Sequence, residues 1–308
     1  MKSTTSCMSD NTATNNAVTD SNTNSNSTAA TTASSIGAPT EAYLMNFGSN
    51  EKDAPLLIYF PGLDETGKDL ISLEMNSFKQ DFDVRGLIIP ADDLDDWDRL
   101  ATAAIALIRH EVSNMPAGTP VCLCAESFGG CLALKVLEAA PDLFDRVILV
   151  NPASSFNRVP WLNLGTQLMP LVPEIFFNQS LNGLSDGLVF FLASLDRISV
   201  EAKQALAKST SAAPKETLVK RLNLMNRFSV DEGRLQRVRC PVLLIGSKGD
   251  RILPSVEEAH RLNQIFPNSQ TLILPHSGHA CLAEKDVDLD QIMRDRHIMP
   301  LRSPAASL

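Results

Sequence analysis

The sequence predicts an α/β fold with a doubly wound, mostly parallel sheet, and two observations support this fold class. From about residue 55 onward, short runs rich in Val, Ile and Leu alternate with longer amphipathic stretches. Short apolar runs without polar alternation are typical of strands buried on both faces of a parallel sheet. The amphipathic stretches are long enough for the helices that connect such strands, so the expected order is βαβαβαβ.

Each element follows from its own segment. Strands are predicted at six apolar runs, which are residues 56–60, 84–89, 121–124, 147–150, 242–245 and 271–274, and on a weaker signal at residues 42–47. Crossover helices are predicted at residues 97–112, 129–140, 255–265 and 288–296. Residues 41–151 and 237–298 are therefore expected to form one core domain.

The alternation fails between residues 152 and 236, where helix-like, partly apolar segments follow one another without a convincing strand. We expect this insertion to form a helical cap over the carboxyl ends of the strands, where ligands of such sheets bind. Its large apolar side chains either line a lipid-like pocket or form the packing core of the cap. They are Trp161, Leu162, Leu168, Met169, Leu171, Phe176, Phe177, Phe190 and Phe191.

Residues 1–40 differ in composition from the rest of the chain. Of these 40 positions, 30 are Ser, Thr, Asn or Ala, and no aromatic residue occurs among them. Such a segment buries too little apolar surface to offset the entropy of ordering, so we predict a disordered tail. A transit peptide is the alternative, although Lys2 is the one basic residue there and Asp10 and Asp20 are acidic.

Charge and hydropathy exclude further classes of function. The 308 residues include 27 basic and 36 acidic ones, and the formal net charge of -9 has the wrong sign for binding a phosphate backbone. We therefore expect no nucleic acid partner. No apolar stretch approaches the ~18 residues of a membrane span, so no transmembrane segment is expected, while peripheral contact with a membrane stays open. The oligomeric state is not predicted.

The six cysteines and an acidic cluster at residues 92–98 offer no metal site. The cysteines match no zinc spacing, and most lie in or beside apolar runs, where a free thiol behaves as a small buried hydrophobe. Reduced thiols indicate a reducing compartment, and we expect the cytoplasm. The acidic cluster lacks the Gly and terminal Glu of a calcium loop, so we interpret it as helix N-capping. No metal or organic cofactor is expected.

Ser127 lies between a predicted buried strand and a predicted helix. The surrounding sequence AESFGG is similar to the G-x-S-x-G pattern of a nucleophile elbow, with Ala125 in place of the first Gly. That position needs a small side chain so that the strand and the helix can approach, and Ala is a mild departure. The match is weak by itself, because Ser is common in turns, but the buried strand before it strengthens the interpretation.

Two further residues follow later strands in the way that a serine nucleophile requires. Asp250 lies after the strand at residues 242–245, and His279 lies after the strand at residues 271–274. The chain order Ser, Asp, His, each beyond a strand end, is that of the α/β-hydrolase triad. A neutral His accepts the Ser proton near pH 7, and a carboxylate fixes its tautomer. His276 is the rival base, but it lies nearer the strand end and lacks a preceding Gly.

An oxyanion hole is needed because the tetrahedral intermediate of acyl transfer carries negative charge on the former carbonyl oxygen. The segment FPGLDETG follows the first clear strand, where this fold supplies one backbone N–H. The predicted donors are the N–H groups of Leu63 and of Phe128, the residue after Ser127. An ordinary Pro-Gly turn is the plainer interpretation of the segment taken alone.

Five stretches resemble the hydrolase domain of the esterase/lipase/thioesterase family that includes the plant phytyl ester synthases. They are LLIYFPGLDETG, AESFGGCLAL, VILVNPASSF, SKGDRILPSVEEAHRL and SGHACLAEKDVDL, between about residues 55 and 290. The resemblance implies Ser127 as nucleophile, Asp250 and His279 as its partners, and Leu63 and Phe128 at the oxyanion hole. It also implies transfer of fatty acyl groups to phytol or diacylglycerol, and it makes plastid or thylakoid association the alternative to the cytoplasm.

Two departures from this family affect the expected activity. Ala125 and Glu126 stand where the family has Gly and, more commonly, Asp. The plant proteins continue into a second, acyltransferase-like domain, and no H-x4-D motif starts at His279, because Glu284 stands at its last position. We therefore expect any acyl transfer to run through an acyl-enzyme at Ser127.

The sequence thus predicts a serine hydrolase or acyltransferase that acts through an acyl-enzyme on long-chain acyl esters or thioesters. Its expected partner is an acyl lipid or another small-molecule ester. A small-molecule carboxylesterase or C–C hydrolase is the alternative among enzymes, because fold alone does not fix the substrate. A non-catalytic binding module on a hydrolase fold is the alternative outside enzymes.

Overall fold

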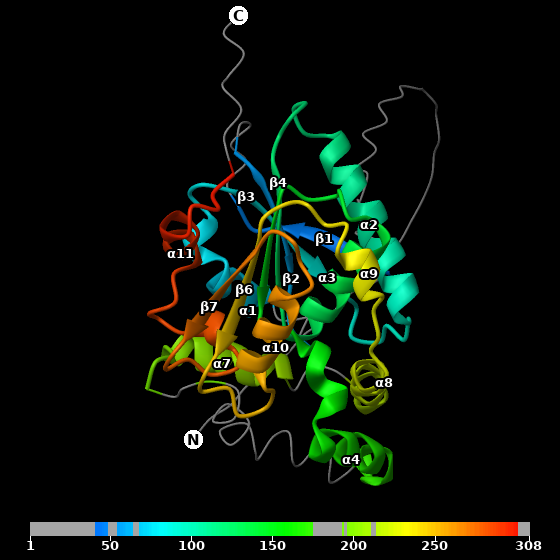
Figure 1. Cartoon of the computed structure of the whole chain (residues 1–308). Helices are drawn as coiled ribbons and strands as arrows, with labels where there is room; N and C mark the ends of the chain where they lie inside the picture. The colour runs from blue at the N-terminus through cyan, green and yellow to red at the C-terminus, as the bar shows by residue number, and fades with distance from the viewer. Residues whose placement is uncertain are drawn as a thin grey trace, which may run out of the picture. The chain divides into compact units, whose positions relative to one another are not determined.

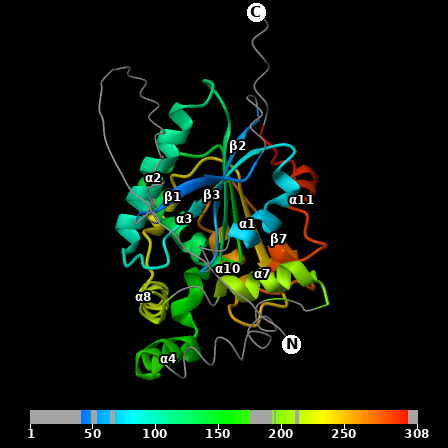
Figure 2. The same cartoon turned by 180° about the vertical axis from the view of Figure 1, so that it is seen from behind.

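A computed structural model describes residues 41–48, 54–63, 68–174, 193, 196–210 and 214–300. These residues belong to one compact unit, residues 39–308. A seven-stranded sheet runs through this unit, with helices on both of its faces (Figure 1; Figure 2). The predicted α/β fold with a doubly wound, mostly parallel sheet is confirmed. The predicted disordered tail lies outside the described residues.

The strands pair in the order β1-β3-β2-β4-β5-β6-β7. Their bounds are β1 Tyr43–Asn46, β2 Leu56–Phe60, β3 Asp83–Ile88, β4 Val121–Glu126, β5 Arg146–Val150, β6 Val242–Ser247 and β7 Ser269–Leu274. Strand β1 pairs antiparallel with β3, and each other neighbouring pair is parallel. The weakly signalled strand is therefore present, as an antiparallel edge of the sheet.

The helices cover both faces and the carboxyl edge of the sheet. The α-helices are α1 Lys68–Glu74, α2 Trp97–Ser113, α3 Ser127–Ala139, α4 Pro160–Leu168, α7 Val200–Thr210, α8 Lys215–Asn226, α9 Glu232–Leu235, α10 Ser255–Asn263 and α11 Leu289–Asp295. Short 3-10 helices lie at η1 Asn76–Phe78, η2 Ala153–Arg158, η3 Met169–Leu171 and η4 Cys281–Ala283. The four predicted crossover helices correspond to α2, α3, α10 and α11, whereas α1 was not predicted.

Strand β2 illustrates why the sequences of the strands are continuously apolar. Leu56, Ile58 and Phe60 pack into the larger core cluster, which includes residues of α2, α3 and α10. Leu57 and Tyr59 pack into the second cluster, which includes residues of α1 and α11. Because successive side chains of a strand point to opposite faces, both faces of β2 are buried and both require apolar residues.

Between β5 and β6 the chain passes through η2, α4, η3, α7, α8 and α9, and the described part of this stretch contains no named strand. The assignment of residues 152–236 as a separate cap stays a prediction. One expectation about this segment is wrong. Trp161, Leu168 and Leu171 are exposed, so they do not form a packing core of the cap. Leu162 does pack against the larger core.

Other predicted apolar residues of the cap have different outcomes. Met169 is half-buried, whereas Phe176, Phe177, Phe190 and Phe191 lie outside the described residues.

The acidic cluster caps a helix, as predicted. The Asp96 side chain accepts a hydrogen bond from the Arg99 backbone N–H at 3.0 Å and so forms the N-cap of α2. Asp95 forms an ion pair with the Arg99 side chain at 3.2 Å. Carboxylates at this end of a helix also interact favourably with its dipole. The cluster is therefore explained by helix capping.

The cysteines are also placed as expected. Cys122, Cys124, Cys131 and Cys281 are buried, Cys240 is partly buried, and all five are free. Burial raises the pKa of the Cys122 thiol to about 12, so this thiol stays protonated and unreactive. Within the described ranges, no helix is both long enough and apolar enough to cross a membrane.

Candidate active site

Ser127 occupies a strained turn between β4 and α3. Its φ is +52°, a value that residues other than Gly rarely adopt, and it is the first residue of α3. Gly129 allows the start of α3 to approach β2, because a Cβ there would lie 2.2 Å from the Phe60 carbonyl oxygen and 2.3 Å from that of Pro61. Ser127 is therefore held at a sharp turn by a close helix–strand contact, as a nucleophile elbow requires.

The structure brings Ser127, His279 and Asp250 together from the carboxyl ends of three strands. The Nε2 atom of His279 lies 2.8 Å from the Ser127 Oγ. On the other side of the ring, Nδ1 lies 2.6 Å from Asp250 Oδ2. His279 is buried, whereas the rival His276 is exposed. The arrangement can move a proton from a hydroxyl to an imidazole that a carboxylate orients.

The Asp250 side chain is buried yet surrounded by hydrogen-bond donors. Its Oδ1 accepts from the backbone N–H groups of Ile252 at 2.8 Å and of Leu253 at 3.0 Å, and its Oδ2 accepts from the Ser255 hydroxyl. Burial by itself would raise the pKa of Asp250. The charge of His279 and the hydrogen bonds from His279, Ser255 and Leu253 outweigh burial, so the pKa lies below its ordinary value. The carboxyl therefore stays ionised near neutral pH.

Asn151 ties the loops of this site together, and the sequence analysis assigned it no role. It is fully buried, directly follows β5 and has a positive φ of +43°. Its Nδ2 donates to the His279 carbonyl oxygen at 2.7 Å and to the Ser247 Oγ at 2.9 Å. Its Oδ1 accepts from the Ser247 backbone N–H at 2.8 Å. A polar residue directly after a buried strand was the signal that could have identified it.

The loops that carry Asp250 and His279 are also joined directly. The Gly249 N–H donates to the Ser277 carbonyl oxygen at 2.9 Å. The Gly278 N–H donates to Glu284 Oε1 at 2.8 Å, and the other oxygen of Glu284 pairs with Arg197 at 3.0 Å. Glu284, which was considered only as part of a missing motif, thus anchors the loop of His279.

Leu63 and Phe128 lie on the two segments from which oxyanion donors were expected. Phe128 is the second residue of α3, its buried ring stacks on Trp97 with centroids 4.7 Å apart, and no side chain caps the start of this helix. The first N–H groups of a helix lack partners within it, so they can bind an anion. Leu63 is partly buried against the larger core, three residues beyond the end of β2. Their role as donors stays a prediction.

A second buried acidic group lies on the α1 side of the sheet. The Tyr59 hydroxyl is 2.8 Å from Glu74 Oε2 and 3.3 Å from Glu126 Oε2, and all three side chains are buried. Burial and the charges of Glu74 and Glu126 raise the pKa of Tyr59 well above its ordinary value, so its hydroxyl stays protonated. Glu126, directly before Ser127, is thus linked to α1 rather than to His279.

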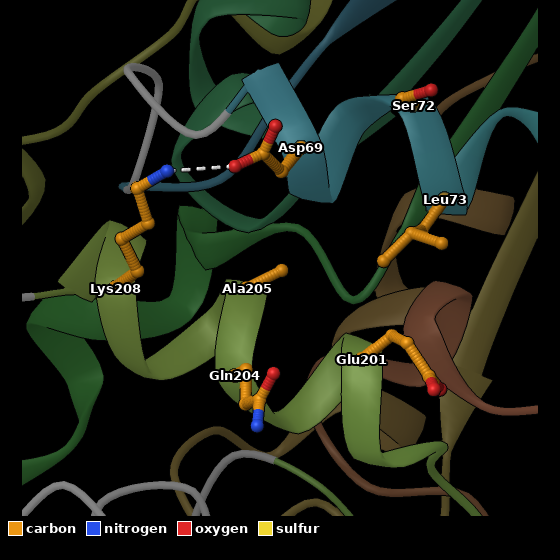
Figure 3. Close-up of a pocket in the computed structure, with 7 residues that line it drawn as sticks. All are labelled: Asp69, Ser72, Leu73, Glu201, Gln204, Ala205 and Lys208. Atoms are coloured by element: carbon orange, nitrogen blue, oxygen red, sulfur yellow. Dashed lines mark hydrogen bonds and ion pairs between the residues drawn. The ribbon is translucent and has the colours of Figure 1, made fainter.

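A surface cavity of about 450 Å³ lies between α1 and α7 (Figure 3). It is lined by Asp69, Ser72, Leu73, Glu201, Gln204, Ala205 and Lys208. Asp69 and Lys208 form an ion pair at 2.8 Å on one side of it. The cavity contains none of Ser127, Asp250 and His279, so it gives no account of the predicted chemistry. No cluster of three metal-ligating side chains occurs within the residues described.

Comparison with known proteins agrees with the fold. The sequence matches the Alpha/beta hydrolase family over residues 70–289. This chain belongs to that family. It is 30% identical over 277 residues to Phytyl ester synthase 1, chloroplastic, of Arabidopsis thaliana, across 84% of this chain and 39% of that protein. Phytyl ester synthase 2, chloroplastic, of the same plant is 28% identical over 84% of this chain and 40% of that protein.

The chain spans about two fifths of the length of these curated relatives. Among solved structures, an esterase from Rhodococcus sp. superposes with a TM-score of 0.65 at 16% identity, over 83% of this chain and 94% of that one. An esterase from Thermogutta terrifontis superposes with a TM-score of 0.64 at 16% identity, over 84% of this chain and 94% of that one. Likeness at this low identity establishes the fold of the α/β hydrolases.

Proposed function

We propose that this chain is a serine hydrolase or acyltransferase that forms an acyl-enzyme at Ser127 with long-chain acyl esters or thioesters. One observation carries the proposal. Ser127, at a strained turn, contacts His279 at 2.8 Å, and His279 contacts the buried Asp250 at 2.6 Å. These are the contacts that a nucleophile, its general base and the group that orients the base require.

In the first half-reaction, the Ser127 Oγ attacks the acyl carbonyl carbon while its proton moves to His279 Nε2. Asp250 accepts a hydrogen bond from Nδ1–H, which leaves Nε2 free as the base and stabilises the imidazolium. The N–H groups of Leu63 and Phe128 bind the oxyanion. The tetrahedral intermediate then expels the alcohol or thiol, which takes the proton from His279, and Ser127 is left acylated.

In the second half-reaction, His279 removes a proton from water or from an alcohol, which attacks the acyl carbonyl of Ser127. Expulsion of Ser127 restores its hydroxyl and releases either a fatty acid or a new ester. The choice depends on how well the site excludes water from the acyl-enzyme. The named activity of the Arabidopsis relatives, phytyl ester synthesis, supports a lipid alcohol as acceptor.

Labelling with a fluorophosphonate probe tests the nucleophile. We expect the intact protein to be labelled at one site, and Ser127→Ala to lose the label while keeping its melting temperature within a few degrees. Of the two neighbouring histidines, His279 is the one that contacts Ser127. His276→Ala is therefore the matched control for His279→Ala. If the wild-type protein is not labelled, a non-catalytic binding module is the better interpretation.

Product analysis tests the acyl acceptor and the chain length. A long-chain acyl donor incubated with phytol or diacylglycerol should yield the corresponding ester. Free fatty acid as the sole product would reject acyl transfer and leave a hydrolase. If short-chain esters react faster than long-chain ones, the protein is a small-molecule carboxylesterase instead.

A further inference from the structure

Four large apolar side chains lie exposed in a row along α4 and η3, which we call the α4 row. Trp161 and Leu164 are each 58% exposed, Leu168 is 50% exposed and Leu171 is 76% exposed. Their spacing of three, four and three residues follows one side of a helix. Clusters of exposed apolar side chains are uncommon on the surface of soluble monomeric proteins, and large ones mark interaction sites.

The side of α4 opposite the row packs against the rest of the protein. The helix therefore cannot rotate about its axis to bury the row. Leu162 packs against the larger core. Thr166 is buried, and its hydroxyl donates to the Leu162 carbonyl oxygen at 2.9 Å. The Asn163 side chain donates to the Asn157 carbonyl oxygen of η2 at 2.8 Å. The exposure of the α4 row therefore follows from how its opposite side packs.

Basic residues lie beside the α4 row, although the whole chain has a formal charge of -9. Residues 153–174 and 214–227 together contain five basic residues and two acidic ones. Of the five, Arg221 is buried and Arg158 is paired with Glu258. Lys215, Lys220 and Arg227 are partly or fully exposed and supply the remaining positive charge. Lys215 of α8 donates to the Pro170 carbonyl oxygen at 3.1 Å and to that of Val172, which brings its ammonium group beside Leu171. Helices α4 and α8 lie side by side in both views (Figure 1; Figure 2). The apolar row thus has one cation, Lys215, beside it, and the neighbouring helix α8 carries Lys220.

The position of α4 relates the row to the candidate active site. Helix α4 lies beyond the ends toward which the arrows of β6 and β7 point (Figure 1). Ser127, Asp250 and His279 follow the carboxyl ends of β4, β6 and β7, which form the same edge of the sheet. A surface that contacts the α4 row therefore approaches the protein from the side of the candidate active site.

We propose that the α4 row docks this protein on the surface of an anionic lipid membrane. The inference rests on the proposed function, because such docking brings the carboxyl edge of the sheet to a source of acyl lipids. A helix with an apolar side and a basic flank lies in the interface with its apolar side among the acyl chains. Trp161 suits the boundary, because its ring is apolar and its N–H remains able to bond to water or headgroups.

The charges favour a lipid surface over a second copy of this chain. A two-fold dimer through the α4 row would bring the same patch of both copies together. Lys215 of both copies would then lie at that interface, and like charges at an interface oppose association. An anionic bilayer supplies the opposite charge to Lys215.

Trp161 provides a direct readout, because the protein has only one other tryptophan, Trp97, which is 8% exposed and lies in the core. We expect the emission of the full chain to shift to shorter wavelength on titration with phosphatidylcholine vesicles containing phosphatidylglycerol. The shift should be smaller with phosphatidylcholine alone and should weaken in high salt. Co-sedimentation with the same vesicles measures the bound fraction.

The variant Leu164→Glu/Leu168→Glu should weaken vesicle binding by at least about tenfold, because it places charge where the apolar side chains must enter the interface. The matched control is Leu94→Glu/Val200→Glu, which changes two exposed apolar residues away from the row and should bind as the wild type does. Melting temperatures establish that both variants fold.

Several results would overturn the inference. One is a wild-type protein that binds no anionic vesicles, and another is a row variant that binds as tightly as the control. A third is Trp161 emission that is already at short wavelength and protected from a soluble quencher before vesicles are added, since part of the chain would then cover the row. A dimer that the row variant dissociates would assign the row to a second copy. Fluorophosphonate labelling without vesicles tests the proposed function separately.

Discussion

Two buried acidic groups lie near Ser127, and they are built in opposite ways. Asp250 is a single carboxylate with donors on both oxygens, from His279, Ser255 and two backbone N–H groups. Glu74 and Glu126 are two carboxylates that share the Tyr59 hydroxyl as a donor. The first group is rich in donors, and the second is rich in acceptors.

The difference shows how the protein keeps the Asp250 carboxylate charged while the Tyr59 hydroxyl retains its proton. Donors and the charge of His279 lower the pKa of Asp250 despite its burial. At the other group, burial and the two glutamates raise the pKa of Tyr59. Since a hydroxyl has one proton, it cannot be donated fully to both Glu74 and Glu126. Asp250 thus suits a role that needs a permanent charge, whereas Tyr59 links β2 to α1 and β4.

The largest expected effect follows from removing the charge at the donor-rich group. Asp250→Asn should lower the kcat for a soluble ester by about 10³- to 10⁴-fold, because His279 loses the group that fixes its tautomer and stabilises its charged form. Steady-state kinetics measure the loss. Ser255→Ala is the milder partner variant, because three donors to Asp250 remain. A loss below tenfold in Asp250→Asn would contradict the proposed role.

Removing the amide that ties the loops should have the next largest effect. Asn151→Ala and Asn151→Gly should both lower kcat by up to about 10²-fold, because the backbone of His279 loses its anchor and the ring shifts from Ser127. Glycine adopts the positive φ of Asn151 without strain, so the two variants separate the lost hydrogen bonds from backbone strain. If Asn151→Gly retains full activity, the amide has no positioning role.

At the acceptor-rich group we expect a change in stability rather than in chemistry. Tyr59→Phe should lower the free energy of unfolding by about 1–3 kcal/mol, because two buried carboxylates lose a donor. Glu74→Gln, which removes one of the two like charges, should cost less or should stabilise the protein. Urea denaturation compares the three proteins. Equal stability of Tyr59→Phe and the wild type would show that the hydroxyl contributes nothing.

The smallest effect is a pH dependence of stability that originates from Asp250. Its pKa is lower in the folded protein than the ordinary value near 3.8, so its ionised form stabilises the fold above that pH. This contribution is lost as the pH falls through the lowered pKa. The melting temperature of the wild type relative to Asp250→Asn should therefore rise as the pH is raised from below 3.8 to about pH 5, and should then level off. A difference that does not change with pH would contradict this assignment.

The sequence predicted what depends on local pattern. The turn at Ser127 follows from a buried strand, a small residue at 125 and the glycines after Phe128, and Asp250 and His279 follow later strand ends. The interactions of Asn151 and Tyr59 could not be predicted in this way. Asn151 contacts residues 96 and 128 positions away, and such contacts depend on which strands become neighbours in the sheet.

The α4 row was misinterpreted for a related reason. Helical periodicity indicates that one side of a segment is apolar, but it does not indicate which surface meets that side. Trp161, Leu168 and Leu171 were therefore assigned to a pocket or a packing core, although the structure leaves them exposed.

The close contact at Gly129 also limits how this protein can evolve. The predicted oxyanion donors, Leu63 and Phe128, lie on the two segments that meet there, and any side chain at residue 129 would collide with the Phe60 and Pro61 backbone. Every one of the nineteen other amino acids would push these segments apart. Substitution at this position therefore cannot adjust the spacing of the donors in small steps. Selection for new substrates, in nature or in a mutant library, therefore has more freedom in the segment between β5 and β6 than at this contact.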